Sequence, residues 1–225
     1  MAINTVATHV HEGIMYKIQQ ESSTGMQYAV ASHAVEKDLE IITVWDSING
    51  IPVTAIGAGA FAQMPKLKEV TILENTAIQI AGAAFSNCPQ LMQVSSFAKN
   101  TSFATQAFKD CPNLEEVGAS GEAFLIGQHV FHNCPKLTRL TTDIAKVTDF
   151  AFGHSPAFEG LVFAQNAKFT PNSMIGATAK ELLFFGDVVL LETTTIDIFK
   201  DFRIFCKQRS MFADLVFEGF HVEFW

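Results

Sequence analysis

Five segments between residues 56 and 158 repeat one pattern, in which a run of small residues leads to a phenylalanine and then to a proline. The segments read IGAGAFAQMPKL, IAGAAFSNCPQL, FATQAFKDCPNL, IGQHVFHNCPKL and VTDFAFGHSPAF. The shared phenylalanine recurs at intervals of 24, 23, 23 and 21 residues, at Phe61, Phe85, Phe108, Phe131 and Phe152. A period near 23 that holds in several columns is typical of a stacked solenoid, in which each repeat packs only against its neighbours. The repeat therefore predicts one elongated body and says little about biochemical activity.

Each repeat is expected to contribute two short strands and one short helical turn. An apolar residue stands five positions before the shared phenylalanine (Ile56, Ile80, Phe103, Ile126, Val147) and another six positions after it (Leu67, Leu91, Leu114, Leu137, Phe158). The L-x-x-V-x-I run that follows alternates as a strand does when one of its faces is buried. The small-residue segment is too short to be a stable helix alone, but neighbouring repeats can hold it as a helical turn. We therefore assign the chain to the α/β class, as a single right-handed solenoid.

The regions on either side of the repeats are expected to be caps, because an open solenoid end exposes core side chains and strand edges. Residues 1–50 are predicted to form a strand-rich N-terminal cap, with a loose terminus over 1–12 and strands over 14–19, 26–32 and 39–45. The solenoid is predicted over 51–200, with a worn sixth repeat in which Met174 replaces the phenylalanine. Residues 201–225 are predicted to cap the C-terminal end with a strand, a short helix over 210–215 and a last strand.

Charge and hydropathy exclude several classes of partner. The formal net charge is −8, and no run of basic residues is present, which argues against nucleic acid and against anionic membrane surfaces. No apolar stretch reaches the roughly 18 residues of a membrane-spanning helix. The first 20 residues lack the basic and apolar regions of a signal peptide. Either the protein stays inside the cell or a leader has been removed.

Cysteine and histidine are the residues most able to form a chemical site. Cys88, Cys111 and Cys134 occupy one repeat column, which admits a metal or redox site or a ladder of buried small thiols. Buried packing is favoured, because cysteine is often buried and the first repeat has Met64 in this column. The seven histidines are scattered, and no zinc, P-loop, dinucleotide or nucleophile-elbow motif is present. The sequence predicts no catalytic residue, no cofactor and no metal.

The repeat columns resemble the BspA-like leucine-rich repeats of bacterial surface proteins. The resemblance rests on IGxxAFxxCxxL, on the entry phrase NGIPVTAIGAGAF, on GIMYKI before it and on RIFCKQRSMFADL near the end. It covers roughly residues 13–220 and implies a leucine-rich-repeat solenoid. Members of this family are mostly binding modules, some of them adhesins, without shared catalytic residues. The resemblance therefore implies a cell-surface or secreted protein that binds an unidentified protein partner, and neither an enzyme nor a nucleic-acid binder.

A candidate contact surface follows from the alternation within the L-x-x-V-x-I strands. Outward positions are polar in the first four repeats and include Arg139, but they become apolar in the last two, at Val162, Leu182 and Phe184. Contiguous exposed apolar side chains usually mark a contact surface, so these four residues are the predicted partner-binding set. The alternatives are that the C-terminal cap covers them or that the register slips in the worn repeat. For the whole chain, the alternatives to binding are a structural spacer, an intracellular scaffold and an enzyme with an unrecognised site.

Overall fold

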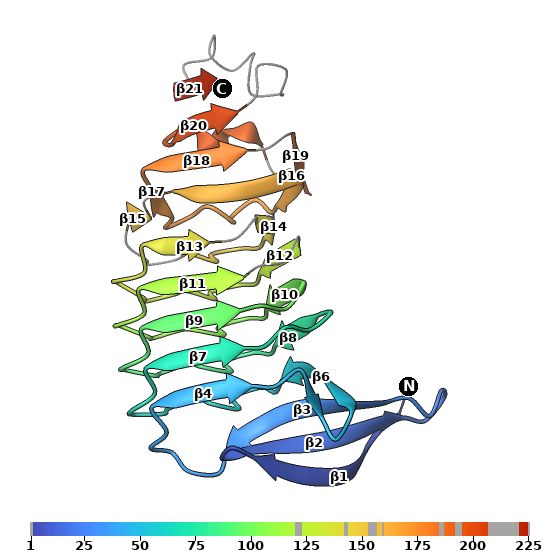
Figure 1. Cartoon of the computed structure of the whole chain (residues 1–225). Helices are drawn as coiled ribbons and strands as arrows, with labels where there is room; N and C mark the ends of the chain where they lie inside the picture. Colours follow the sequence, from blue (N-terminus) through green and yellow to red (C-terminus); the bar gives the residue numbers. More distant parts are fainter. Residues whose placement is uncertain are drawn as a thin grey trace.

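The strands of a computed structural model of the chain stack along one axis, with β1 and β21 at opposite ends (Figure 1). The structure describes residues 2–119, 123–141, 144–152, 157–158, 160–184, 187–191, 195–206 and 221–224. The stack is a β-solenoid of about seven turns, which confirms the solenoid that the repeat predicts.

One side of the stack is a sheet that starts from an antiparallel N-terminal cap. β1 (Ile3–His11) pairs with β2 (Ile14–Glu21), and β2 pairs with β3 (Gln27–Ala34), both antiparallel. From β3 onward each strand pairs in parallel with the strand of the next coil: β6 (Ile51–Ile56), β8 (Ile78–Ile80), β10 (Asn100–Phe103), β12 (Ala123–Ile126) and β14 (Ile144–Val147). The short strand β5 (Ser47–Ile48) forms a hairpin with β6. The second half of β16 (Leu161–Phe169) and β19 (Val188–Leu190) continue this column after β14. We call the outer surface of the column from β6 to β19 face A.

The other side of the stack is built from the second strand of each coil. A parallel sheet joins β4 (Ile41–Val44), β7 (Glu69–Ile72), β9 (Gln93–Ser96), β11 (Glu116–Ala119) and β13 (Arg139–Thr141). A single bridge between Arg139 and Gly160 extends it toward β16 (Leu161–Phe169). The first half of β16 then pairs with β18 (Glu181–Phe184), followed by β20 (Arg203–Cys206) and β21 (His221–Phe224). We call the outer surface of this column face B.

The long strand β16 belongs to both sides of the stack. Its first half carries the column of face B, whereas its second half pairs with β14 and with β19 (Val188–Leu190) on face A. Two short strands, β15 (Ala157–Phe158) and β17 (Thr178–Ala179), pair with each other beside it. The 3-10 helix η1 (Ile196–Phe199) follows β19.

The segments around the shared phenylalanines are turns, because left-handed backbone conformations occur at two residues of the first four segments and at one described residue of the fifth. These lie two positions before the shared phenylalanine (Gly59, Ala83, Gln106, His129, Phe150) and two positions after it (Gln63, Asn87, Asp110, Asn133). The phenylalanine N–H also donates to the next coil and not to its own turn: that of Phe61 reaches the Ala84 carbonyl at 2.8 Å, and that of Phe85 reaches the Ala107 carbonyl at 2.8 Å. An α-helix permits neither feature. The predicted helical turns and the α/β assignment are therefore wrong, and η1 is the one helix among the described residues.

The shared phenylalanines form a continuous ladder through the core. Successive ring centroids lie 5.4, 5.4, 5.8 and 6.3 Å apart from Phe61 to Phe152. All five side chains are fully buried, as are both apolar columns predicted from the repeat. Stacked aromatic pairs each add about 0.5–1.5 kcal/mol beyond the burial of their area. One repeated residue thus supplies both the core and the vertical register of the stack.

The N-terminal cap contains two strands more than expected, β1 and the short β5. The strands predicted near 14–19, 26–32 and 39–45 are present as β2, β3 and β4, but residues 3–11 form β1 and not a loose terminus. The side chains of β1 are mostly exposed, so no apolar alternation marks it in the sequence. It is held instead by its backbone pairing with β2. The helix predicted over 210–215 lies outside the described residues.

Candidate protein-binding surface

Face B presents two rows of outward side chains, because burial alternates along each of its strands. In β7 the side chains of Val70 and Ile72 are buried, whereas Glu69 and Thr71 point outward, and β9 and β11 repeat this order. Residues of successive strands are direct partners, so the outward side chains align from coil to coil. One row contains the first outward residue of each strand, and the other row contains the second. The N-terminal part of the second row consists of Thr71, Ser95 and Gly118.

Two of the four predicted contact residues lie on face B. The side chain of Arg139 is 56% exposed, and its Nη2 lies 2.8 Å from Oε2 of Glu116 on the preceding strand. Val162 is a half-buried outward residue of β16, between the buried Leu161 and Phe163.

The other two predicted contact residues belong to the core. Leu182 and Phe184 have no exposed surface, and the ring of Phe184 lies 4.8 Å from that of Phe163. The prediction that they face outward is wrong, because the segment between the anchor and the strand is one residue shorter in the sixth repeat than in the other five. Its strand begins its buried pair eight positions after the anchor Met174, whereas the buried pair of β16 begins nine positions after Phe152. A shift of one residue moves every side chain of a strand to the opposite face.

The corrected register places different apolar residues on the C-terminal part of face B. Val162, Leu183 and Phe205 are direct partners on β16, β18 and β20, and all three are half-buried. We call them the apolar row. They continue the row that begins with Thr71, Ser95 and Gly118. The same surface therefore changes from polar to apolar along the stack.

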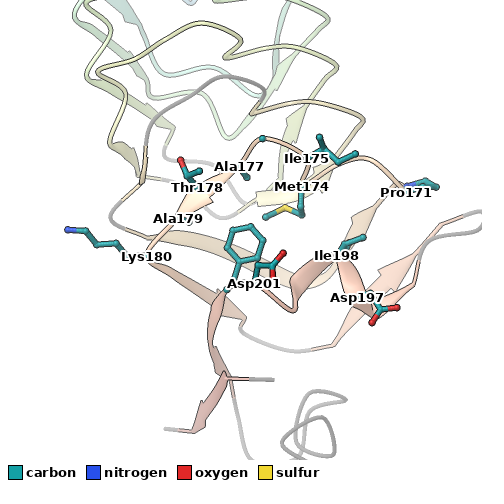
Figure 2. A pocket seen from close by; sticks show the side chains of 12 residues that line it. Pro171, Met174, Ile175, Ala177, Thr178, Ala179, Lys180, Asp197, Ile198 and Asp201 are labelled. Carbon is teal, nitrogen blue, oxygen red and sulfur yellow. The ribbon is translucent and has the colours of Figure 1, made fainter. Parts of the chain in front are cut away.

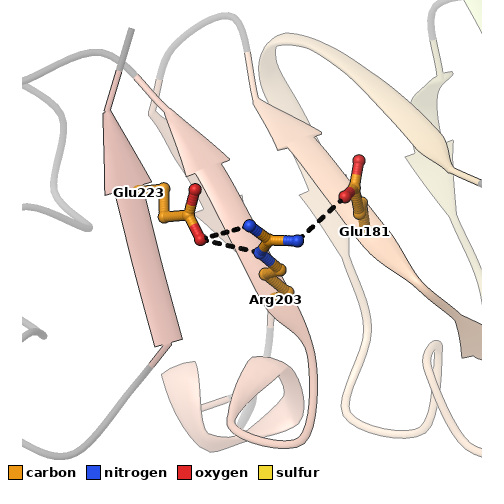
Figure 3. A network of polar contacts seen from close by, with 3 residues as sticks. All are labelled: Glu181, Arg203 and Glu223. Carbon is orange, nitrogen blue, oxygen red and sulfur yellow. Dashed lines mark hydrogen bonds and ion pairs between the residues drawn. The ribbon is translucent and has the colours of Figure 1, made fainter.

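An arginine between two glutamates borders the apolar row (Figure 3). Nη1 of Arg203 lies 3.3 Å from Oε1 of Glu181, and its Nη2 lies 2.6 Å from Oε1 of Glu223. The Arg203 guanidinium carbon also lies 5.0 Å from the centre of the Phe205 ring. These contacts fix the guanidinium in one orientation beside the apolar row.

A cleft of about 550 Å³ opens where the turn of the sixth coil meets η1 (Figure 2). Its floor is apolar, with Met174, Ile198 and Phe202, and its rim carries Asp197, Asp201 and Lys180. Lys180 directly precedes β18, so the cleft borders one end of face B. Carboxylates over an apolar floor suit the cationic, aliphatic side chains of a protein partner.

The cysteine column is a packed ladder and not an exposed site. All four cysteines are free and buried. The thiols of Cys88, Cys111 and Cys134 each donate to a phenylalanine carbonyl of the preceding coil at 3.1 Å. Burial raises the pKa of Cys134 to about 12, which disfavours the reactive thiolate. These findings confirm the packing interpretation.

Among the described residues, no group of three or more His, Cys, Asp and Glu side chains is arranged to hold a metal ion. Within the same residues, no helix combines the length and the apolar character needed to cross a membrane.

Comparisons with known proteins agree with the repeat architecture. The family model of the BspA type leucine-rich repeat region matches residues 41–174 in six copies. No curated protein matches the chain. Among solved structures, a leucine-rich repeat protein of T. pallidum aligns with a TM-score of 0.51 and 15% identity, over 73% of this chain and 86% of that chain.

Two further solved structures align less closely. The pneumococcal vaccine antigen PcpA does so with a TM-score of 0.45 and 17% identity, over 85% of this chain and 52% of its own. A leucine-rich cell surface protein of Faecalibacterium prausnitzii has a TM-score of 0.41 and 12% identity, over 92% of this chain and 74% of its own.

Proposed function

The chain belongs to the BspA-type leucine-rich repeat family, and we propose that it is a non-enzymatic module that binds another protein through the C-terminal part of face B. Leucine-rich repeat proteins bind proteins in general, and the open side of a solenoid offers a long surface for such contacts. The observation that carries the proposal is a change along one row of face B, from Thr71, Ser95 and Gly118 to the apolar row. A contiguous apolar surface rimmed by polar groups is the usual composition of a contact site.

The chemistry of face B indicates what the partner must present. An apolar side chain can pack on Val162, Leu183 and Phe205, while the rim groups Arg203 and Arg139 can bond to carboxylates or carbonyls. Arg203 is held by Glu181 and Glu223, so little side-chain entropy is lost when it makes a further contact. Arginine and aromatic side chains are also the types most enriched among residues that dominate binding energy.

We place this activity at the cell surface or outside the cell, as is usual for bacterial members of the family. Biotinylation of intact source cells with a membrane-impermeant reagent tests the location. Labelling of the chain on intact cells is the expected result, and labelling only after lysis would contradict it.

Photocrosslinking tests the binding proposal. A photoreactive residue at position 183 is expected to capture a protein from surface extracts, whereas the same residue at position 71, on the polar part of face B, is not. The captured protein is then purified and its Kd measured. The triple variant Val162→Asp, Leu183→Asp, Phe205→Asp should bind at least about tenfold more weakly, since it removes the apolar contact.

A matched triple variant on the same face is the control. Thr43→Asp, Thr71→Asp and Ser95→Asp add the same charge to the N-terminal part of face B and should leave the Kd unchanged. Equal losses in both variants, with unchanged melting temperatures, would contradict a localised site. The absence of any saturable partner would favour the alternative function, a structural spacer.

A further inference from the structure

Face A carries a row of outward side chains that ends in two neighbouring lysines. Each member of the row is the direct partner of the next on adjacent parallel strands, in the order Gln79, Ser102, Leu125, Lys146, Lys168 and Val189. Parallel strands lie about 4.8 Å apart, so the first five members extend over about 19 Å along the stack. The row is thus amide and hydroxyl at one end and cationic near the other.

A groove of about 670 Å³ follows this row. Besides members of the row, it is lined by hydroxyl and amide side chains and by a few aliphatic ones, and none of the lining residues that the structure describes is acidic or aromatic. The amides of Asn100 and Asn166 are among them. Asn and Gln side chains both donate and accept hydrogen bonds. The groove therefore matches a chain-like ligand rich in hydroxyl groups.

The two lysines are unusual within this chain because they face each other without a counter-charge. Like charges directly opposite on neighbouring strands are destabilising. Two other lysines do receive a carboxylate from the facing coil: Glu40 lies 2.8 Å from Lys68, and Asp38 lies 3.4 Å from Lys66. Within the described part of the chain, no ion pair is present at Lys146 or Lys168, whose flanking row members are Leu125 and Val189. In a protein of net charge −8, such a pair is a local site for anions.

We propose that this groove binds an acidic saccharide chain whose carboxylates pair with Lys146 and Lys168 and whose hydroxyls bond to the amide and hydroxyl end. An acidic peptide fits less well, because the groove lies over a sheet whose backbone groups are already paired between strands and cannot pair with an added strand. Single-stranded nucleic acid also fits less well, since the described lining of the groove offers two cations and no aromatic platform for bases. The site lies on face A, whereas the proposed protein contact lies on face B, and it does not depend on that contact.

Calorimetric titration of the whole chain with a galacturonate oligomer tests the proposal. Saturable binding that weakens as salt is raised is the expected result, because the lysines are near the surface. A neutral galactose oligomer of the same length should bind at least about tenfold more weakly. The double variant Lys146→Gln, Lys168→Gln should lose at least about tenfold in affinity, since charge-assisted hydrogen bonds are lost.

Two further variants make the test specific. Lys17→Gln with Lys136→Gln removes the same charge from other surfaces and should leave the affinity unchanged. Leu125→Lys extends the cationic part of the row by one strand and should strengthen binding several-fold. Failure of the galacturonate oligomer to bind, or equal binding by both double variants, overturns the proposal. Polyglutamate that binds as tightly, through the same lysines, overturns the saccharide class.

Discussion

The coils up to Phe152, the regular part, and the coils from β16 onward, the C-terminal part, bury their phenylalanine side chains in different arrangements. In the regular part, one phenylalanine per coil stacks on the next, and the rings of Phe85 and Phe108 lie within 6° of parallel. Among the described residues of the C-terminal part, a compact cluster is formed by Phe163, Phe169, Phe184 and Phe199. Its member Phe199, from η1, makes edge contacts with Phe169 at 4.9 Å and with Phe184 at 5.3 Å.

The difference shows which property of the solenoid is obligatory. The ladder requires the same residue at the same position in every coil, whereas the cluster tolerates an anchor changed to Met174 and a segment after that anchor that is one residue shorter. Both arrangements bury all their rings. Continuous burial is therefore conserved between the two parts of the molecule, while the repeat period is not.

The largest expected effect is that of Phe184→Asp. A carboxylate would replace a fully buried ring at the centre of the cluster, where burial of an unpaired charge is strongly unfavourable. We expect loss of cooperative folding, with a cost beyond the exceptional range of about 4–5 kcal/mol. Leu183→Asp, one residue away but half-buried and outward, should cost about 1 kcal/mol or less. Urea denaturation followed by circular dichroism checks both, and a folded Phe184→Asp would contradict the corrected register.

Phe108→Ala is expected to have the next largest effect, about 3–5 kcal/mol. Its ring contacts Phe85 at 5.4 Å, Phe131 at 5.8 Å and Phe103 at 5.0 Å. Phe152→Ala, at the end of the ladder and 6.3 Å from Phe131, should fall at the lower end of the same range. Equilibrium unfolding at constant m-value gives both losses. A greater loss at Phe152 would show that the ladder is not tightest in its middle.

An alkaline pH dependence is expected from the thiol ladder of the regular part. The pKa of Cys134 is raised to about 12 from its ordinary value of 9.0. Between these values the unfolded chain has lost a proton that the native protein retains, so stability falls as pH rises. The contribution is about 1.4 kcal/mol per pH unit.

The control for this prediction is Cys134→Ala, which should remove that part of the slope. Tyr16, whose pKa burial raises to about 12, contributes equally to both proteins and cancels in the comparison. Thermal unfolding measured across this range checks the difference. Identical slopes would exclude the thiol as the source.

The smallest expected effect is that of Arg203→Met. Its two ion pairs join half-exposed side chains, and such pairs contribute about 0–1 kcal/mol. The loss should shrink further in high salt, which screens exposed charges. Urea unfolding at low and high salt measures it. A loss as large as that of Phe108→Ala would mean that the C-terminal coils depend on this network as much as the regular coils depend on the ladder.

The sequence predicts the regular part of the fold in detail, because each buried column keeps a constant offset from the shared phenylalanine. The buried positions of Phe61 and Leu67, and the thiol of Cys88, follow from their column alone. The predictions that fail concern features that the repeat pattern does not encode. β1 is held by backbone pairing to β2 and has no apolar alternation, and the turns take left-handed conformations at residues such as Ala83 and Gln106.

The contact surface is only partly predictable for the same reason. Arg139 and Val162 precede the short repeat and are placed correctly on face B. Leu182 and Phe184 follow it and are placed on the wrong side. The buried position of Leu182 is better predicted from the preceding strand than from the anchor Met174. Leu182 follows Leu161 by 21 residues, an interval that already occurs between Phe131 and Phe152. The pairing of Lys146 with Lys168 on face A could not be predicted, because it depends on the register between neighbouring strands, which no single repeat specifies.

The direction of the strands determines how the molecule carries force. The strands run across the stack, and β1 and β21 lie at its two ends (Figure 1). Tension applied between these ends pulls neighbouring strands directly apart, so hydrogen bonds open one after another and are not sheared together. Each coil released in this way adds about 80 Å of chain, given about 3.5 Å per extended residue. Since each coil contacts only its neighbours, we expect the protein to lengthen coil by coil under such tension.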